Sequence, residues 1–283
     1  MSDARNSAVQ TPYLTLSTGS LYTYGLARTF ELMQGSPFDG VEIIVDSRWD
    51  TRQAEYIKAL TEQWGIPVHS IHAPFRTISE MGADYPSTLK ATIRLAEQVG
   101  ARTVVIHPIS RGTPDLAQWL QQNLAGLQAQ TPILLTVENL PRMVVKRLGI
   151  LQRDFHEFWH PDAMRPFAAL TMDTTHFGVS QINILDAWQQ LSATVQHIHL
   201  SDEYNGREHL FPGEGTLPLA DFLGELSRSR FGGIVVVELH PFALHAGRDD
   251  EKVRDRIHQA AAFCREHLKM ESRHAEPAAR AGR

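Results

Sequence analysis

Side chains able to bind metal ions stand at intervals along the chain, each after a short run of apolar or β-branched residues. Six such runs end in a histidine or an acidic residue: His72, His107, Glu138, Asp173, His199 and Glu238. Mixed imidazole and carboxylate ligands suit Zn²⁺ or Mn²⁺, whereas Ca²⁺ prefers shells made only of oxygen. Several inward carboxylates without a cation would repel one another and be costly to bury. The pattern therefore predicts a divalent-metal site.

Two levels of involvement are expected at this site. The minimal set for one ion is Glu138, Asp173, His199 and Glu238. Four histidines would surround it, either as ligands of further ions or as contacts to substrate: His72, His107, His176 and His209. Asp202 also follows a strand end, in the sequence HLSD.

The apolar runs are typical of β-strands. They cover residues 13–17, 41–45, 68–72, 103–107, 133–138, 168–173, 195–200 and 234–238. Between them lie amphipathic segments expected to be helices, at 23–33, 52–64, 86–99, 114–129, 182–191, 218–229 and 249–267. The interval 142–166 is the least regular, and a short helix is expected there around 153–158.

Alternating strands and helices predict an α/β fold with parallel strands, most economically a single closed (β/α)8 TIM barrel. An open doubly wound sheet is the alternative, but the segment after the first strand, STGS at 17–20, lacks the GxGxxG nucleotide loop. Catalytic groups of such barrels lie at the carboxyl ends of the strands, where the six residues fall. Side chains two apart share a face, so Thr136, Thr171 and His197 should point inward with the ligands that follow them.

The expected organisation is a flexible N-terminus at 1–10, a catalytic barrel at 11–268 and a polar, disordered tail at 269–283.

The net charge of −5 gives no general basis for binding nucleic acid. The single Cys264 excludes an intrachain disulfide and suits a reducing compartment. The polar start lacks a signal peptide, and no apolar run reaches the roughly 18 residues that span a bilayer. We therefore expect a cytoplasmic protein without membrane partners. The sequence leaves open whether the chain forms a homo-oligomer.

An ordered set of motifs resembles the xylose isomerase-like TIM barrels, also called AP endonuclease family 2. The motifs run in family order over residues 13–265: FDGVEI (38–43), HSIHAPF (69–75), VVIHP (104–108), VENLP (137–141), MDTTHFG (172–178), HIHLSD (197–202), HLFPGEG (209–215) and VVVELHP (235–241). The sugar isomerases and epimerases of this superfamily bind one divalent metal through four residues that match Glu138, Asp173, His199 and Glu238. The resemblance also implies that Glu138 and Glu238 shuttle the proton, and that His176 contacts substrate.

The superfamily's endonuclease IV-type enzymes instead hold three zinc ions with nine ligands. Eight of these are matched here: His72, His107, Glu138, Asp173, His176, His199, His209 and Glu238. The ninth, an aspartate, corresponds to Arg207, although the neighbouring Glu208 could take its place after a small backbone shift. An arginine there suits a phosphate or a substrate oxygen. The segment after His72 is also short for a loop that penetrates DNA.

The resulting expectation is a divalent-metal-dependent isomerase or epimerase acting on a sugar, polyol or sugar phosphate. One Mn²⁺ or Zn²⁺ ion would stabilise a metal-bound enediolate while Glu138 and Glu238 transfer the proton. The histidines in the sequence would be sufficient for up to three ions. His72, His107, His176 and Arg207 are the expected substrate contacts. The alternative is an endonuclease IV-like zinc phosphoesterase with several ions. A dehydratase or lyase on the same scaffold and a non-catalytic binding module also stay open.

Overall fold

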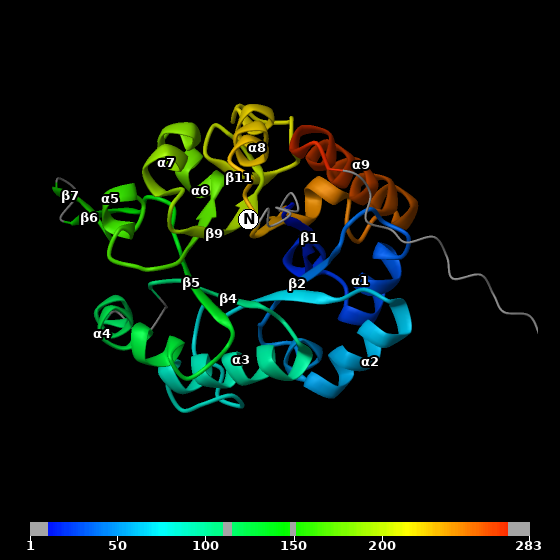
Figure 1. The fold of residues 1–283 in the computed structure, drawn as a ribbon, viewed down its shortest axis with the longest axis horizontal. Coiled ribbons are helices and arrows are strands. Elements are labelled where there is room, and N and C mark those ends of the chain that lie inside the picture. Colours follow the sequence, from blue (N-terminus) through cyan, green and yellow to red (C-terminus); the bar gives the residue numbers. More distant parts are fainter. Residues whose placement is uncertain (1–10, 110–114, 148–150, 271–283) are drawn as a thin grey trace, which may run out of the picture.

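Eight parallel strands close into a barrel surrounded by helices (Figure 1). The computed structural model describes residues 11–109, 115–147 and 151–270. The barrel strands are β1 (Tyr13–Ser17), β2 (Gly40–Ile44), β3 (Val68–His72), β4 (Thr103–Ile106), β5 (Leu134–Glu138), β8 (Leu170–Asp173), β9 (Val195–Leu200) and β12 (Ile234–Val237). Because β1 pairs with both β2 and β12, the sheet is closed. The predicted single TIM barrel is confirmed, and the open sheet is excluded.

Successive side chains of a barrel strand point alternately into the barrel interior and toward the surrounding helices. Val137, Met172 and Ile198 are buried in the apolar core. On the other face, the Oγ1 atoms of Thr136 and Thr171 lie 2.7 Å apart in a hydrogen bond between neighbouring strands. This alternation brings the polar residue at the end of each strand to the inside of the barrel mouth.

The helices around the barrel are α1 (Leu26–Met33), α2 (Ala54–Trp64), α3 (Tyr85–Val99), α4 (Leu116–Gln128), α5 (Pro161–Met164), α7 (Ile184–Leu191), α8 (Leu219–Arg228) and α9 (Asp250–Leu268). A further short helix, α6 (Thr174–Val179), directly follows β8 at the barrel mouth. Gly65 and Gly100 end α2 and α3 in the left-handed conformation, with φ of 65° and 75°, as their positions in the sequence predict. Cys264 of α9 is fully buried in the core. Among the described residues, no helix is long and apolar enough to cross a membrane.

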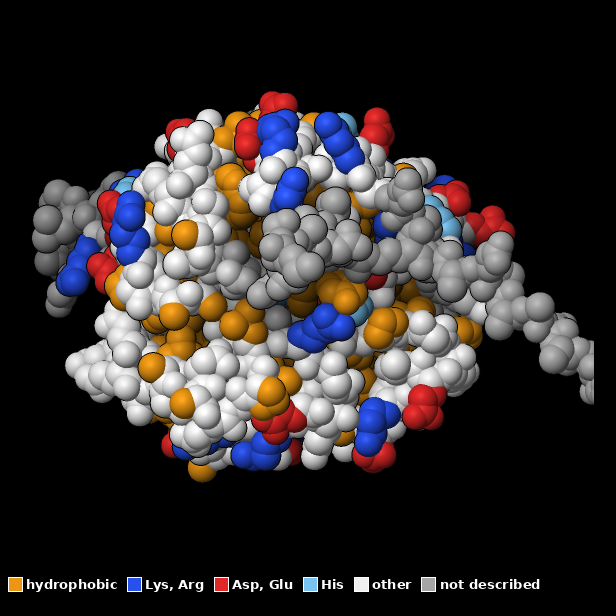
Figure 2. Space-filling model, viewed as in Figure 1, with side chains coloured by type: hydrophobic (Ala, Val, Ile, Leu, Met, Phe, Trp, Pro, Cys, Tyr) orange, Lys and Arg blue, Asp and Glu red, His pale blue; other side chains and the backbone are white. Residues whose placement is uncertain are grey.

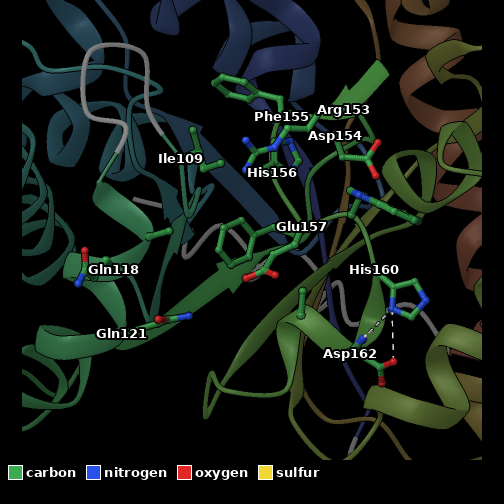
Figure 3. A pocket seen from close by; sticks show the side chains of 14 residues that line it. Ile109, Gln118, Gln121, Arg153, Asp154, Phe155, His156, Glu157, His160 and Asp162 are labelled. Atoms are coloured by element: carbon green, nitrogen blue, oxygen red, sulfur yellow. Dashed lines mark hydrogen bonds and ion pairs between the residues drawn. The ribbon is translucent and has the colours of Figure 1, made fainter. Parts of the chain in front are cut away.

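The prediction of a short helix around 153–158 is wrong. An antiparallel hairpin of β6 (Val144–Arg147) and β7 (Leu151–Asp154) takes up the start of this region, where Val145 pairs with Arg153. Residues 155–158 follow as an irregular segment that lines a cavity (Figure 3). The β-branched residues Val144 and Val145 favour an extended backbone. The helical turn comes later, in α5, where His160 caps the helix and Pro161 starts it.

A second hairpin rises from the end of β9. It joins β10 (Asp202–Tyr204) to β11 (Arg207–Leu210) through Asn205 and Gly206, which both have positive φ, 52° and 77°. Such a two-residue turn is typical of tight hairpins. Within residues 11–109, 115–147 and 151–270, three 3₁₀ segments lie in the loops: η1 (Thr18–Leu21), η2 (Asp50–Arg52) and η3 (Pro241–Leu244). In Figure 2, basic and acidic side chains are interspersed over the viewed face. The N-terminus expected at 1–10 and residues 271–283 of the tail expected at 269–283 lie outside the described residues.

Candidate metal centre

Glu138, the last residue of β5, lies at the centre of a buried cluster at the barrel mouth. Its side chain is 1% exposed, and both of its oxygens meet imidazole nitrogens. Oε1 lies 2.9 Å from Nδ1 of His199, whereas Oε2 lies 2.9 Å from Nε2 of His107 and 3.2 Å from Nε2 of His72. Three strands thus deliver histidines to one carboxylate.

The four residues of the expected minimal set come together. Glu138, Asp173, His199 and Glu238 each offer a ligand atom, and these atoms all lie within 4.8 Å of one another. Nδ1 of His199 lies 3.0 Å from Oε2 of Glu238 and 3.9 Å from Oδ2 of Asp173. This is one imidazole nitrogen facing three carboxylates in a buried space.

Asp173 gives a direct test of whether a cation fits this space. Its Oδ1 accepts the backbone N–H of His176, but its Oδ2 is buried without a hydrogen-bond partner. Burial raises the pKa of Asp173, since the charged form is poorly solvated there. A divalent cation would complete the coordination of Oδ2 and neutralise the neighbouring carboxylates. The residues present therefore fit a metal ion.

The pKa values of the histidine and the glutamates in this cluster are set by the charges of their neighbours. Burial alone would lower the pKa of His199, but Glu138, Glu238 and Glu42 outweigh it and hold this pKa well above its usual value. Burial alone would raise the pKa of Glu238, but the charge of His199 lowers it to about 2. The same balance, with His199 and His107 as partners, holds the pKa of Glu138 well below its usual range. Glu138 and Glu238 are thus ionised beside a protonated imidazole when only the protein is present.

The remaining histidines form two further groups that overlap the first. His72 joins Glu138 and His199, and His176 joins Asp173 and His209, each group with ligand atoms within 4.8 Å. His176 Nδ1 lies 2.8 Å from the carbonyl oxygen of Asn139 and 3.6 Å from Oε1 of Glu138. These groups give the site ligands for additional ions, or polar contacts for a substrate.

Arg207 lies away from this cluster. The side chain is exposed at the start of β11, where it lines a separate cavity of about 370 Å³ with Glu208 and His240. Its positive charge contributes to lowering the pKa of His240, after the larger effect of burial. Glu208 remains in electrostatic contact with His176, whose pKa its charge helps to raise against the effect of burial.

Asp202, which also follows a strand end, has a structural role. Its carboxylate accepts the backbone N–H groups of Gly213, Gly215 and Leu217, each at 3.0 Å. It therefore holds the loop after β11 against the barrel. A Cβ atom at Gly215 would collide with this carboxylate, which explains the glycine.

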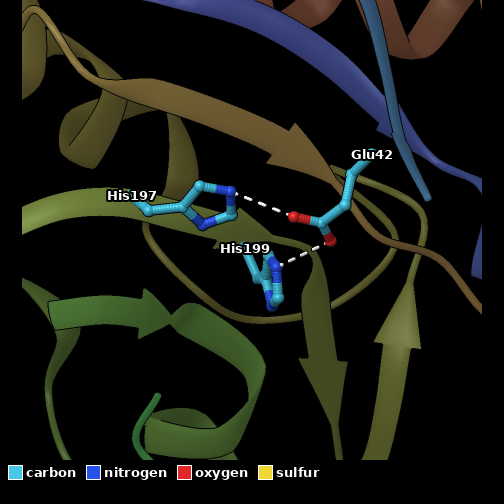
Figure 4. Close-up of side chains that lie close together, drawn as sticks. All are labelled: Glu42, His197 and His199. Atoms are coloured by element: carbon cyan, nitrogen blue, oxygen red, sulfur yellow. Dashed lines mark hydrogen bonds and ion pairs between the residues drawn. The ribbon is translucent and has the colours of Figure 1, made fainter. Parts of the chain in front are cut away.

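Sequence reasoning missed two residues of the site. Glu42 on β2 is fully buried and contacts His199 and His197 (Figure 4). Asn139 pairs its amide with the backbone of Asp173, at 2.8 and 3.1 Å, and so ties the end of β5 to the end of β8. A signal existed for Glu42, because a lone carboxylate inside the strand sequence GVEII must find buried partners.

Comparisons with known proteins agree with this architecture. The family model described as xylose isomerase-like TIM barrel matches residues 30–267. An uncharacterized protein of Mycobacterium tuberculosis is 29% identical over 275 residues, which cover 89% of this chain and 96% of that protein. Among solved structures, a D-tagatose 3-epimerase-like protein superposes with a TM-score of 0.65 at 17% identity, covering 91% of this chain and 97% of its own. The 3-keto-D-glucoside 4-epimerase of E. coli superposes with a TM-score of 0.67 at 18% identity. The superposition covers 89% of this chain and 99% of that protein.

Proposed function

Because the chain belongs to the xylose isomerase-like TIM barrel family, we propose that it is a divalent-metal-dependent isomerase or epimerase of a sugar, polyol or sugar phosphate. The observation that carries the proposal is the unpartnered Oδ2 of Asp173 beside Glu138, Glu238 and His199. Sugar epimerases among the solved structures of the same fold support this choice of chemistry.

The proposed cofactor is one Mn²⁺ or Zn²⁺ ion held by Glu138, Asp173, His199 and Glu238. When bound, such an ion supplies Lewis-acid polarisation of a substrate carbonyl. The residues themselves must bind the substrate, orient it and move a proton at the carbon next to that carbonyl.

Glu238 is the better placed of the two glutamates to remove the proton. Its side chain is 13% exposed, whereas that of Glu138 is 1% exposed and has both oxygens engaged by histidines. The charge of His199 lowers the pKa of Glu238 against the effect of burial, so Glu238 is in the ionised form that a proton acceptor requires. For epimerisation, Glu138 would donate a proton to the opposite face of the substrate. It would first take this proton from Nε2 of His72, 3.2 Å from its Oε2, while the proton on Glu238 would be released to solvent.

Other residues at the mouth are suited to contact the substrate. The side chain of His107 is 15% exposed, and Phe75 lies over it with ring centroids 4.7 Å apart. Phe75 is 48% exposed and lines a cavity of about 460 Å³ with Val45, Asp46 and Arg76. This volume is within the range of small-molecule sites, and an aromatic face beside polar groups suits a sugar ring.

Deuterium exchange tests this function. The Mn²⁺-loaded protein is incubated in D₂O with a panel of ketoses that includes D-tagatose, D-psicose and a ketose phosphate. We expect deuterium at one carbon next to the carbonyl, together with an epimer or isomer, and loss of both in Glu238→Gln. A protein that binds the metal but exchanges no proton in any of these sugars would contradict the proposal.

The zinc phosphoesterase is the second candidate, and the overlapping ligand groups favour it. His72 and His107 beside Glu138, and His176 and His209 beside Asp173, could serve two further ions. Clustered ions would activate a water and stabilise a departing oxygen. Two or three tightly held zinc ions per chain, with hydrolysis of a phosphoester, would favour this candidate over the isomerase.

A further inference from the structure

Glu42 connects strands on opposite sides of the barrel interior. It projects from β2, is 0% exposed and has hydrogen-bond partners on both oxygens (Figure 4). Oε1 lies 3.0 Å from Nε2 of His199, whereas Oε2 lies 3.0 Å from Nε2 of His197 and accepts the hydroxyl of Ser70 at 2.7 Å. Two strands separate β2 from β9 in the barrel order on one side and four on the other, so this contact spans the interior.

His199 consequently has carboxylates at both ring nitrogens. Nδ1 faces Glu138 and Glu238, at 2.9 and 3.0 Å, and Nε2 faces Glu42. A carboxylate can only accept from a ring nitrogen, so Glu42 requires the N–H of His199 to be at Nε2. An ion bound among Glu138, Asp173 and Glu238 would replace the proton on Nδ1, while the contact to Glu42 keeps the N–H at Nε2.

We propose that Glu42 is a positioning residue, which fixes the ring orientation and tautomer of His199 so that Nδ1 is presented to the metal. The inference rests on the proposed metal dependence and extends it to a residue outside the ligand set. A carboxylate behind a metal-binding histidine orients the ring and raises its basicity, and its loss typically costs about 10- to 100-fold in metal affinity.

Glu42 acts through His199 and is not itself a ligand. Glu42, His197 and His199 also lie close enough to be considered as a separate cation site. However, the oxygens of Glu42 already contact the two imidazoles and the hydroxyl of Ser70 directly, at 2.7–3.0 Å. These are hydrogen-bond distances, so both oxygens of Glu42 have partners. The group around Glu138, by contrast, includes Oδ2 of Asp173, which is buried without a partner.

The experiment measures Mn²⁺ and Zn²⁺ affinity by chelator competition on the full-length, metal-stripped protein, with melting temperature recorded in parallel. The test variant is Glu42→Gln, whose amide cannot accept from all three donors. Ser70→Ala is the matched control, because it removes a contact to Oε2 and leaves the contact between Glu42 and His199. Asp39→Asn is a second control for a buried ionic contact, since Asp39 pairs with Arg265 outside the cluster.

We expect Glu42→Gln to lower the affinity by about 10-fold or more, and both controls to stay within about threefold of wild type. Glu42→Asp, which keeps the charge but shortens the reach, should also lower the affinity and serves if Glu42→Gln does not fold. Unchanged metal affinity in both Glu42 variants would overturn the positioning role of Glu42 and leave the proposed function standing. Two ions in wild type with one lost in Glu42→Gln would also overturn it, because Glu42 would then be a ligand. A wild-type protein that binds no ion would overturn the proposed function as well.

Discussion

Asp173 caps the helix that carries His176: its Oδ1 accepts the backbone N–H of His176 at 2.8 Å, which leaves Oδ2 buried and unpartnered. One carboxylate thus positions α6 with one oxygen and offers the other to a cation. The strand end and the helix start are thereby coupled to the metal centre.

Asp173→Asn separates these two roles. The amide oxygen can still cap α6, while the second oxygen becomes an NH₂ group that cannot bind a cation. We expect metal affinity to fall by about 10-fold or more, with a metal-free melting temperature at or above wild type, because a poorly solvated charge has been removed. Calorimetric titration and thermal unfolding measure both quantities. Asp84→Asn is the control, since Asp84 caps α3 in the same way through Ser87. Wild-type affinity in Asp173→Asn would contradict the assignment.

Glu238→Gln should remove turnover and leave the fold intact. Loss of a positioned acid or base typically slows a reaction by about 10²- to 10⁴-fold. The readouts are deuterium exchange with saturating Mn²⁺ and the circular dichroism spectrum. Glu225→Gln, at an exposed ion pair with Arg228, is the control and should keep full activity. Wild-type turnover in Glu238→Gln would rule out its role in proton transfer.

His199→Ala should weaken metal binding far more than Arg207→Ala. His199 meets the carboxylates through Nδ1, whereas Arg207 lines a separate cavity. We expect a loss of at least about 100-fold for His199→Ala and a change within about threefold for Arg207→Ala. Competition with a chromogenic chelator gives both values. The reverse order would mean that the ligands are wrongly assigned.

The metal-free protein should lose stability as the pH rises. The pKa of His199 is well above its usual value in the folded chain, so folding favours the protonated ring. This stabilisation is fully present below the unfolded pKa of about 6.5 and is lost as the pH rises through the folded value. In the presence of chelator, we expect the melting temperature of wild type to fall more steeply than that of His199→Gln as the pH is raised above about 6.5. Equal slopes for the two proteins would exclude a protonated His199.

The sequence was sufficient for the barrel because periodicity and strand-end chemistry are local signals. The hairpin of β6 and β7 was missed, since its pairing of Val145 with Arg153 depends on a chain reversal that periodicity does not report. Glu42 was missed for a different reason: its partner His199 is 157 residues away and meets it only across the closed barrel. Arg207 is next to site residues in sequence, but the turn at Asn205 and Gly206 directs it to another cavity.

The metal content of the purified chain shows whether Asp173 and its neighbours hold an ion. The protein is purified without chelator, and its Mn and Zn are quantified by mass spectrometry beside Asp173→Asn purified in the same way. We expect one tightly held divalent ion per wild-type chain and a marked loss in the variant. A wild-type chain that holds no ion, and gains none on titration with Mn²⁺ or Zn²⁺, would contradict this expectation.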